Sequence, residues 1–337
     1  MKNRIILLKD TYEIILSEEE FEPNINEGQV LIKISSSGIC GSDLHYFRNG
    51  GLGTFRQKMP ISLGHEPSGI VVDSKSKLFK NYDRVAIEPG HSCGSCFFCK
   101  KDRLNLCPSV KFLGANDVGA LRDYIVVHES QLIKISDDIS FEKAALIEPF
   151  GVALHNINIA NIEPEIYNKK IAIIGGGTIG LLIYILLKKN YPQIDVDLIE
   201  NNYYRKELLS NNFNISFNSL DFYSNNKYDY IFETGANQNS LSFANNIIGP
   251  AAKIIFISIP ETDMIELNPH KLRINEAQII FSRRSALDFK ILMEKFYCTD
   301  IDSDLFVTNN FTPQDAQTAF DVAETKKCIK VQINFND

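Results

Sequence analysis

Four cysteines that lie close together form the clearest chemical pattern in this sequence. Cys93, Cys96 and Cys99 are spaced by two residues, and Cys107 follows after seven more. Four thiolates can enclose one Zn²⁺ ion tetrahedrally and leave no open position, as in structural zinc sites. An iron–sulfur cluster, a redox pair and chance clustering are the alternatives. The pattern favours a structural zinc site that stabilises a lobe of about residues 90–110 with little apolar core.

A second set of candidate metal ligands lies nearer the start of the chain. Cys40, His65 and Glu66 offer one sulfur, one nitrogen and one oxygen donor. Zinc accepts all three, and in catalytic sites a fourth position stays open. A core thiol and an interior histidine are the ordinary alternatives for Cys40 and His65. Ser42 and His45 follow Cys40 closely; they could carry a proton away, or they could be a turn serine and a surface histidine.

Glu148 is an acidic residue in an apolar stretch, residues 144–150, inside a segment, 140–160, whose pattern predicts a helix. An unpaired charge is costly to bury. Two interpretations are equally open. Glu148 is either a surface residue beside a helix kink at Pro149 or a second carboxylate that faces the metal group.

Three glycines mark a candidate dinucleotide site. Gly175, Gly177 and Gly180 follow a short apolar strand and open an apolar helix. In such a motif the first glycine makes a tight turn, the second lets the backbone approach a pyrophosphate, and the third allows close helix–strand packing. The phosphates then sit at the helix N-terminus, so Ile179 belongs to the expected cofactor site. A purely structural glycine turn is the alternative.

The next strand, residues 195–200, ends in Glu200, which lies 20 residues beyond Gly180. A carboxylate at this place can bond both hydroxyls of an adenosine ribose and repels a 2′-phosphate, so the sequence favours NAD over NADP. Arg205 follows closely, joins the expected cofactor site, and keeps NADP open as an alternative.

The elements that must position these groups fall into two kinds. Short strands with turns between them indicate a mostly β domain over residues 1–150, with a loop at 46–60. Its expected strands are 5–8, 11–16, 29–35, 69–73, 84–88, 122–128 and 131–135.

Residues 151–285 alternate apolar strands and helices, which predicts a parallel, doubly wound α/β sheet. Its expected strands are 170–174, 195–200, 228–233, 253–259 and 278–282. The stretch between Glu200 and Tyr228 has room for one helix and a short strand. Residues 286–337 are expected to form helices at 286–296 and 313–325 and a last strand at 329–335.

Length and composition set limits on the function. A chain of 337 residues suggests two domains, and a net charge of −7 argues against nucleic acid as a partner. No apolar run reaches the roughly 18 residues of a membrane span, and no signal peptide is evident. An odd number of cysteines, seven, with four crowded together fits metal binding better than disulfides. A soluble cytoplasmic protein is expected.

With these motifs in this order, the sequence resembles the zinc-dependent medium-chain dehydrogenase/reductase family over nearly its whole length. The likeness is greatest to the sorbitol (polyol) dehydrogenase branch, while idonate, threonine and galactitol-phosphate dehydrogenases share much of the pattern. The segments that carry the likeness are 38–43, 42–46, 49–53 before Pro60, 64–66, the four-cysteine lobe, 85–89, 145–149 and 175–180. Two departures are residues 249–252, Gly-Pro-Ala-Ala, and a short segment after Glu200 in which a crossover helix is expected to be reduced or missing.

The resemblance implies roles for individual residues. Cys40, His65 and Glu66 would hold a catalytic zinc, which Glu148 approaches directly or through water. Asp43 would orient His65, as metal-bound imidazoles usually require. The residues expected to meet the substrate are Tyr46, Phe112 and Arg283.

The implied fold is a GroES-like catalytic domain, built from residues 1–150 and 286–337, around an inserted Rossmann domain at 151–285. The implied reaction oxidises a secondary alcohol of a polyol or sugar derivative, with zinc as Lewis acid and NAD as hydride acceptor. Ser42 would pass the proton, through the nicotinamide ribose, to His45 near solvent.

Relatives with this pattern are commonly dimers or tetramers, which implies a homo-oligomer. The alternatives for function are the same chemistry on a sugar acid, threonine or a sugar-alcohol phosphate, and a non-catalytic zinc and NAD sensor. A nucleic-acid module built on the four-cysteine lobe is disfavoured by the acidic charge balance.

Overall fold

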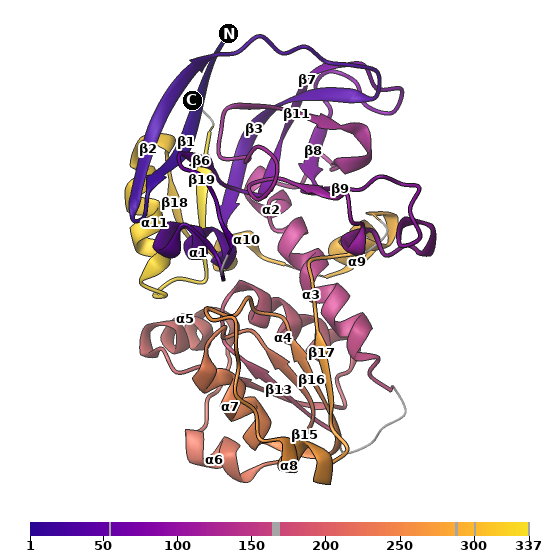
Figure 1. The fold of residues 1–337 in the computed structure, drawn as a ribbon, viewed down its shortest axis with the longest axis vertical. Helices are drawn as coiled ribbons and strands as arrows, with labels where there is room; N and C mark the ends of the chain where they lie inside the picture. The colour runs from indigo at the N-terminus through magenta and orange to yellow at the C-terminus, as the bar shows by residue number, and fades with distance from the viewer. Residues whose placement is uncertain (54, 164–168, 287–288, 300, 336–337) are drawn as a thin grey trace. The chain divides into compact units, whose positions relative to one another are not determined.

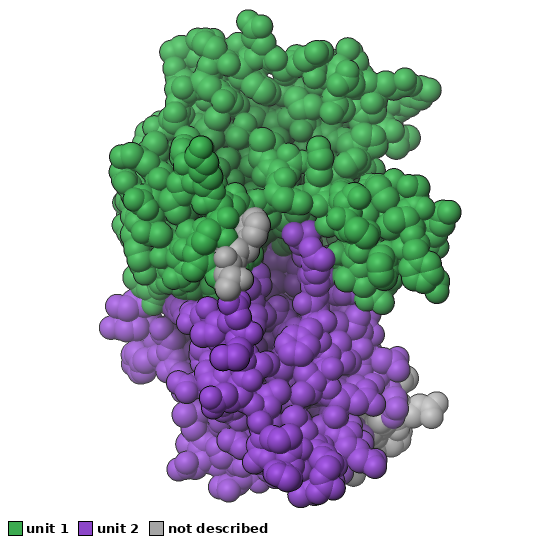
Figure 2. Space-filling view, viewed as in Figure 1, with its two compact units in different colours: residues 1–148, 286–325, 330–337 green, residues 149–285, 326–329 purple. Residues whose placement is uncertain are grey.

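The structure is a computed structural model that describes residues 1–53, 55–163, 169–286, 289–299 and 301–335. The chain divides into two compact units, coloured green and purple in Figure 2. Unit 1 contains residues 1–148, 286–325 and 330–337, and unit 2 contains residues 149–285 and 326–329. The sequence predicts domain boundaries at residues 150 and 285. It does not predict that residues 326–329 belong to unit 2.

A seven-stranded sheet forms the centre of unit 1, in the order β12-β8-β7-β3-β19-β18 with β11 paired to β3. Its strands are β3 (Gln29–Ile39), β7 (Glu66–Ser74), β8 (Arg84–Ile87), β11 (Tyr124–His128), β12 (Leu132–Lys134), β18 (Val307–Phe311) and β19 (Lys330–Asn334). The C-terminal strand β19 runs antiparallel to β3, with Val331 opposite Ile39 (Figure 1). Both ends of the chain therefore contribute to one sheet.

The smaller sheets of unit 1 surround this centre. They are built from β1 (Lys2–Asp10), β2 (Glu13–Glu20) and β6 (Ile61–Ser62), from β9 (Gly90–His91) with β10 (Lys111–Phe112), and from β4 (Gly51–Leu52) with β5 (Phe55–Arg56). The first two strands extend beyond the predicted 5–8 and 11–16 because they pair with each other along nearly their whole length.

Helix α1 (Gly41–Asn49) is absent from the expected elements, which place a loop from residue 46 onward. Asp43 explains the helix start, because its carboxylate accepts a hydrogen bond from the backbone N–H of Cys40 at 2.9 Å. Gly50 ends the helix in a left-handed conformation at φ 66°. The loop prediction for residues 46–49 is therefore wrong.

A single helix over residues 140–160 is also wrong, because the structure has two. Ser140 caps α2 (Phe141–Ala144), its hydroxyl accepting from the Lys143 N–H at 3.1 Å. After a break, α3 (Ile147–Ala160) follows, and most of it belongs to unit 2. The other helices of unit 1 are η1 (Cys99–Lys101), η2 (Leu104–Leu106), η3 (Glu129–Gln131), α9 (Phe289–Cys298), α10 (Ser303–Phe306), η4 (Pro313–Asp315) and α11 (Ala316–Glu324). Part of the helix predicted at 286–296, residues 287–288, lies outside the described residues.

Unit 2 is built on a parallel sheet of five strands in the order β14-β13-β15-β16-β17. The strands are β13 (Lys170–Ile174), β14 (Asp195–Ile199), β15 (Tyr228–Glu233), β16 (Ile248–Phe256) and β17 (Gln278–Phe281). The helices of this sheet are α4 (Thr178–Asn190), α5 (Tyr203–Phe213), α6 (Leu220–Asn225), α7 (Gln238–Asn246) and α8 (Pro269–Ile274). The predicted α/β class, with a Rossmann-type parallel sheet, is confirmed.

The segment between Glu200 and Tyr228 differs from the prediction of one helix and a short strand. It forms two helices, α5 and α6, and residues 201–227 contain no strand. The reason is local: the side chains of Asn202 and Ser219 accept hydrogen bonds from the first turns of α5 and α6. As a result β14 is an end strand of the five-stranded sheet.

Candidate active site

The structure brings the three candidate ligands of the first metal group together. Cys40 follows β3 as the N-cap of α1, while His65 and Glu66 stand at the start of β7, the neighbour of β3. One ligand atom from each lies within 4.8 Å of the others. His65 and Glu66 are buried. A sulfur, a nitrogen and an oxygen at this spacing fit a zinc ion with one open position.

Asp43 fixes the orientation of the His65 ring. Its Oδ1 lies 3.5 Å from His65 Nδ1 and 3.3 Å from the backbone N of Gly64. Burial raises the pKa of Asp43, but the charge of His65 and the hydrogen bonds outweigh it, so the pKa falls below its usual value. The other ring nitrogen, Nε2, therefore remains for a ligand, and Ser42 Oγ lies 3.4 Å from it.

His65 shows the electrostatic character of the group. Burial lowers its pKa, yet Asp43 and Cys40 act in the opposite direction and raise it well above the ordinary value of 6.5. The negative charge of Asp43 therefore favours a positive charge at this position. A cation that binds here would supply that charge.

Lys330 is a neighbour of this group that sequence reasoning missed. It is 3% exposed, forms an ion pair with Glu66, and donates from Nζ to the carbonyl of Ile39 at 3.0 Å. A Cβ at Gly38 would lie 1.9 Å from Glu66 Oε2 and 2.6 Å from Lys330 Cε, so glycine is required there. In the strand predicted at 329–335 polar and apolar residues alternate, so the sequence places Lys330 on the polar face and gives no sign that it is buried.

Glu148 lies within electrostatic reach of the same group. Burial raises the pKa of its carboxyl to about 8, Glu66 and Glu88 add to the rise, and His65 and Lys330 reduce it. This environment favours the interpretation that Glu148 faces the metal-ligand group over the interpretation that it is a surface residue.

The remaining expected site residues occupy different places. Phe112 is buried with its ring centroid 5.6 Å from that of His65, and Tyr46 is buried on α1. His45, expected near solvent, is only 6% exposed, because α1 buries the run from Asp43 to Phe47. Arg283 follows β17 in unit 2 and is exposed.

The four cysteines of the lobe are also gathered, with their sulfurs within 4.8 Å of one another. The Sγ–Sγ distances are 3.5 Å for Cys96–Cys99, 3.6 Å for Cys93–Cys107 and 3.9 Å for Cys93–Cys99. Zinc–sulfur bonds of about 2.3 Å in a tetrahedron put the sulfurs roughly 3.8 Å apart. The geometry thus fits a single ion better than a cluster, in which thiolates bind separate irons.

The thiols of the lobe differ in acidity. Backbone N–H groups of Ser95 and Cys96 lower the pKa of Cys93 to about 6, whereas burial raises the pKa of Cys99 to about 11. An ion must therefore displace protons from the buried thiol, whereas the exposed one is already largely a thiolate at neutral pH.

The glycine motif in unit 2 has the geometry that a bound pyrophosphate requires. Gly175 has φ 102°, and a Cβ there would lie 2.6 Å from Thr234 Oγ1. A Cβ at Gly180 would lie 1.9 Å from the Gly175 carbonyl, whereas one at Gly177 would meet nothing within 4 Å. The backbone at Gly177, the N-cap of α4, is thus open to a ligand, and Ile179 lies half-buried in the first turn.

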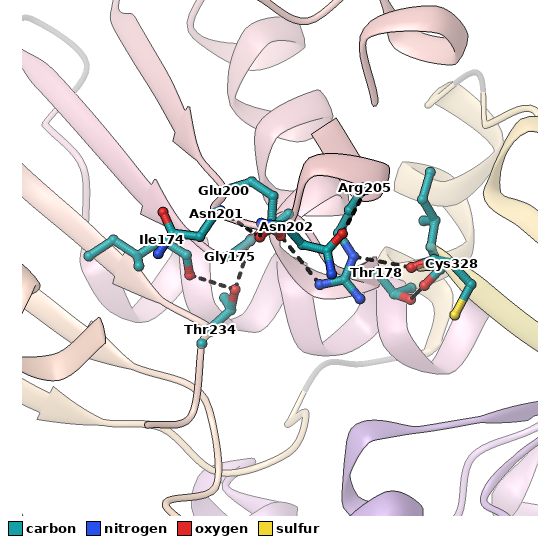
Figure 3. Close-up of polar contacts among 12 residues, drawn as sticks. Ile174, Gly175, Thr178, Glu200, Asn201, Asn202, Arg205, Thr234 and Cys328 are labelled. Atoms are coloured by element: carbon teal, nitrogen blue, oxygen red, sulfur yellow. Dashed lines mark hydrogen bonds and ion pairs between the residues drawn. The ribbon is translucent and has the colours of Figure 1, made fainter. Parts of the chain in front are cut away.

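Glu200 lies at the end of β14, 8% exposed. Its carboxylate accepts backbone hydrogen bonds from Gly176 at 2.9 Å, Asn201 at 2.7 Å and Asn202 at 2.8 Å, and it pairs with Arg205 at 3.3 Å (Figure 3). Because Glu200 pairs with Arg205, the guanidinium is partly neutralised. It is therefore less suited to bind the 2′-phosphate of NADP.

The segment 326–329 contacts this site, which the sequence did not indicate. Arg205 Nε donates to the Cys328 carbonyl at 3.1 Å, and Thr178 Oγ1 donates to the Ile329 carbonyl at 2.8 Å (Figure 3). Cys298 and Cys328 belong to neither cysteine group and are expected from the sequence to be core thiols. Cys328 is buried, but Cys298 is exposed, so the expectation is wrong for Cys298.

A mostly β unit with a Cys-His-Glu group, joined to a unit with a parallel dinucleotide-type sheet, defines a class of zinc-type dehydrogenases. The alcohol dehydrogenase GroES-like domain matches residues 26–137. A sorbitol dehydrogenase of Bacillus subtilis is 33% identical over 325 residues, which cover 92% of this chain and 91% of that protein. The chain belongs to the zinc-type medium-chain alcohol dehydrogenase family.

Two further comparisons agree. An L-idonate 5-dehydrogenase of Vitis vinifera is 29% identical over 333 residues, 93% of this chain and 89% of that protein. The crystal structure of an Escherichia coli alcohol dehydrogenase with NADH is 25% identical, with a TM-score of 0.85 over 99% of each chain. The predicted GroES-like and Rossmann architecture is confirmed.

Proposed function

We propose that the chain catalyses the reversible oxidation of a secondary alcohol on a polyol or sugar derivative, with zinc and NAD as cofactors. The observation that carries the proposal is the Cys40–His65–Glu66 group, with Ser42 Oγ 3.4 Å from His65 Nε2. This arrangement joins a metal-ligand set to a hydroxyl that can move a proton. The relatives named sorbitol dehydrogenase and L-idonate 5-dehydrogenase support the substrate class.

The residues around the proposed zinc would orient its ligands and move the proton of the substrate. Bound zinc would lower the pKa of the substrate hydroxyl, and NAD would accept the hydride. Asp43 holds His65 Nδ1 so that Nε2 faces the ligand position. Ser42 takes the proton and passes it on toward His45, which stands three residues later on α1. A relay of this kind contributes roughly 10²–10⁴-fold to the rate.

Cys93, Cys96, Cys99 and Cys107 would hold the second, structural zinc, because their sulfurs form a closed set. Gly175, Gly177, Ile179, Gly180, Glu200 and Arg205 would bind NAD. Glu148, Tyr46, Phe112 and Arg283 are proposed to act on or contact the substrate side of the site.

The test is an activity assay with a matched cysteine control. Purified protein with zinc and NAD⁺ should form NADH, followed by its absorbance, on addition of sorbitol, xylitol or a related polyol. Cys40→Ser should abolish turnover and leave the circular dichroism spectrum unchanged, whereas Cys298→Ser, at an exposed cysteine outside both groups, should stay active. Full activity in Cys40→Ser would show that the zinc assignment is wrong.

A second candidate is the same chemistry on a sugar acid, which the likeness to an L-idonate 5-dehydrogenase favours. The two candidates share every site residue, so variants do not separate them. A panel of polyols and sugar acids with NAD⁺ and NADP⁺ does, through the ratio of kcat/KM values.

Assembly and location complete the proposal. A homo-oligomer is supported by β17, which ends its sheet and carries Phe281 with 65% exposure. Sedimentation equilibrium should give at least twice the chain mass. A cytoplasmic location is supported by the seven free cysteines, which fit a reducing compartment, and cell fractionation tests it. Separately, no helix among the described residues is long and apolar enough to cross a membrane.

A further inference from the structure

Glu233, the last residue of β15, has a fully buried side chain with 0% exposure. Its Oε1 accepts hydrogen bonds from the backbone N of Gly235 at 2.7 Å, the backbone N of Ala236 at 3.1 Å and Ser240 Oγ at 2.6 Å. Its Oε2 accepts from Ser258 Oγ. All four of these donors are neutral, which is unusual for a buried carboxylate.

These four donors come from two parts of unit 2. Gly235 and Ala236 belong to the turn from β15 into α7, Ser240 lies in the first turn of α7, and Ser258 belongs to the segment that leaves β16. The backbone carbonyl of Glu233 also accepts from Ile257 N at 3.0 Å. Hydrogen bonds to an ionised acceptor are about twice as strong as neutral ones. One carboxylate thus fastens both parts to the end of the sheet.

The neighbouring residue extends this attachment to the glycine motif. Thr234 Oγ1 lies 2.8 Å from the carbonyl of Ile174 and 3.0 Å from that of Gly175 (Figure 3). A Cβ at Gly175 would lie only 2.6 Å from Thr234 Oγ1, so the contact requires glycine. Glu233 and Thr234 together therefore tie the loops after β13, β15 and β16 to one another.

The carboxyl ends of parallel strands are the place where open α/β sheets bind dinucleotides. We propose that Glu233 is a positioning residue for NAD binding, which holds the loops after β15 and β16 in the conformation that receives the cofactor. The proposal rests on the proposed function, since it requires that unit 2 binds NAD.

Glu233→Gln tests the proposal because it keeps the size of the side chain. The amide replaces one acceptor oxygen with an N–H₂ donor. That donor must then face N–H or O–H groups that now donate hydrogen bonds to the carboxylate. We expect the Kd for NADH to rise by roughly tenfold or more, as the loss of charge-assisted hydrogen bonds implies. The increase in NADH fluorescence on binding measures the Kd directly.

Asp229→Asn is the matched control, because Asp229 lies near the start of the same strand. Its carboxylate accepts from Lys169 Nζ at 2.7 Å and from the backbone N of Lys170 at 2.9 Å, away from the loops in question. We expect Asp229→Asn to lower the melting temperature and to leave the Kd for NADH unchanged. If the Glu233 carboxylate were only structural, its replacement and that of Asp229 would have the same effect on the Kd for NADH.

The measured Kd values for NADH distinguish the positioning role of Glu233 from the proposed NAD-dependent function. If Glu233→Gln binds NADH as the wild type does, or if Asp229→Asn weakens NADH equally, the positioning role is wrong. If the wild type itself binds no NADH, the proposed function fails first.

Should Glu233→Gln not fold, Ser240→Ala and Ser258→Ala each remove one donor without adding a new group. Each is then expected to weaken NADH by a few-fold, and wild-type affinity in both would overturn the role.

Discussion

The two metal-ligand groups of unit 1 differ in what holds them in place. The four cysteines lie in a lobe whose buried apolar cluster is small, Cys99, Cys107 and Val110 with Cys96 packed against it. Cys40, His65 and Glu66 lie at the ends of β3 and β7, neighbouring strands of the seven-stranded sheet. The difference predicts that the shape of the lobe would depend on a bound ion, whereas the sheet positions the other group in advance.

The surroundings of the two groups differ as well. The titratable neighbours of the Cys-His-Glu group are Asp43, Lys330 and Glu148. Besides burial, which acts on all three, His65 lowers the pKa of Asp43, and Glu66 raises the pKa values of Lys330 and Glu148. The four thiolates of the lobe are held by backbone N–H groups and by one another. A closed sulfur site only has to bind an ion, but a reactive site must also control protons.

Cys99→Ser should separate the two groups most strongly. Because the lobe lacks a core of its own, loss of one thiolate should release its zinc and unfold residues 93–107, lowering stability by several kcal/mol. Metal analysis should show the loss of one zinc equivalent, and hydrogen exchange should show the lobe deprotected.

Cys40→Ser is the comparison for this experiment. It should lose the other zinc equivalent and leave the exchange rates of residues 93–107 unchanged. Equal deprotection of the lobe in both variants would contradict the contrast between them.

Asp43→Asn should have a smaller effect, confined to the sheet-held group. The amide keeps the side-chain size but loses the charge that orients and stabilises His65, which typically lowers metal affinity or activity by about 10–100-fold. Zinc content after graded dialysis against a chelator measures it, with the lobe zinc as an internal reference.

Asp123→Asn is the matched control, since Asp123 is a buried carboxylate of unit 1 that pairs with Arg4 at 2.9 Å. It should leave zinc retention as in the wild type. If both variants lost zinc alike, the effect of Asp43 would be one of general stability.

The ligand groups could be predicted because they are local in sequence. His65 and Glu66 are adjacent, the four cysteines lie within one short loop, and the glycine motif directly precedes its helix. Spacing alone then limits the chemistry, and the strand periodicity limits the fold. The parallel sheet and its strand positions follow from the same local patterns.

The missed features depend on contacts between distant residues. Lys330 meets Glu66 only because β19 pairs with β3, which no pattern near either residue indicates. Glu233 has four neutral donors that become partners only after the loops fold. Helix α1 depends on Asp43 in two ways that one residue type does not reveal, because its carboxylate both caps the helix and faces His65.

A separate expected effect is the pH dependence that Glu148 gives to the sheet-held group. Burial raises the pKa of its carboxyl from 4.5 to about 8. Between these pH values the folded chain keeps a proton that the unfolded chain has released. The free energy of unfolding should therefore fall as the pH rises through this window, by at most about 1.4 kcal/mol per pH unit.

Glu148→Gln is neutral at every pH and should remove this part of the dependence. The comparison is made in the Cys40→Ser background, where the ligand set is incomplete but the lobe keeps its ion. Urea unfolding across the window from 4.5 to about 8 should give a flatter profile for Glu148→Gln. Glu142→Gln, in the same segment and bonded to Asn334 Nδ2 at 3.2 Å, should keep the original slope. If the chain with Glu148 and the Glu148→Gln variant gave parallel profiles, the Glu148 carboxyl would be ionised in the folded chain. The charges around His65 would then not include a proton held by Glu148.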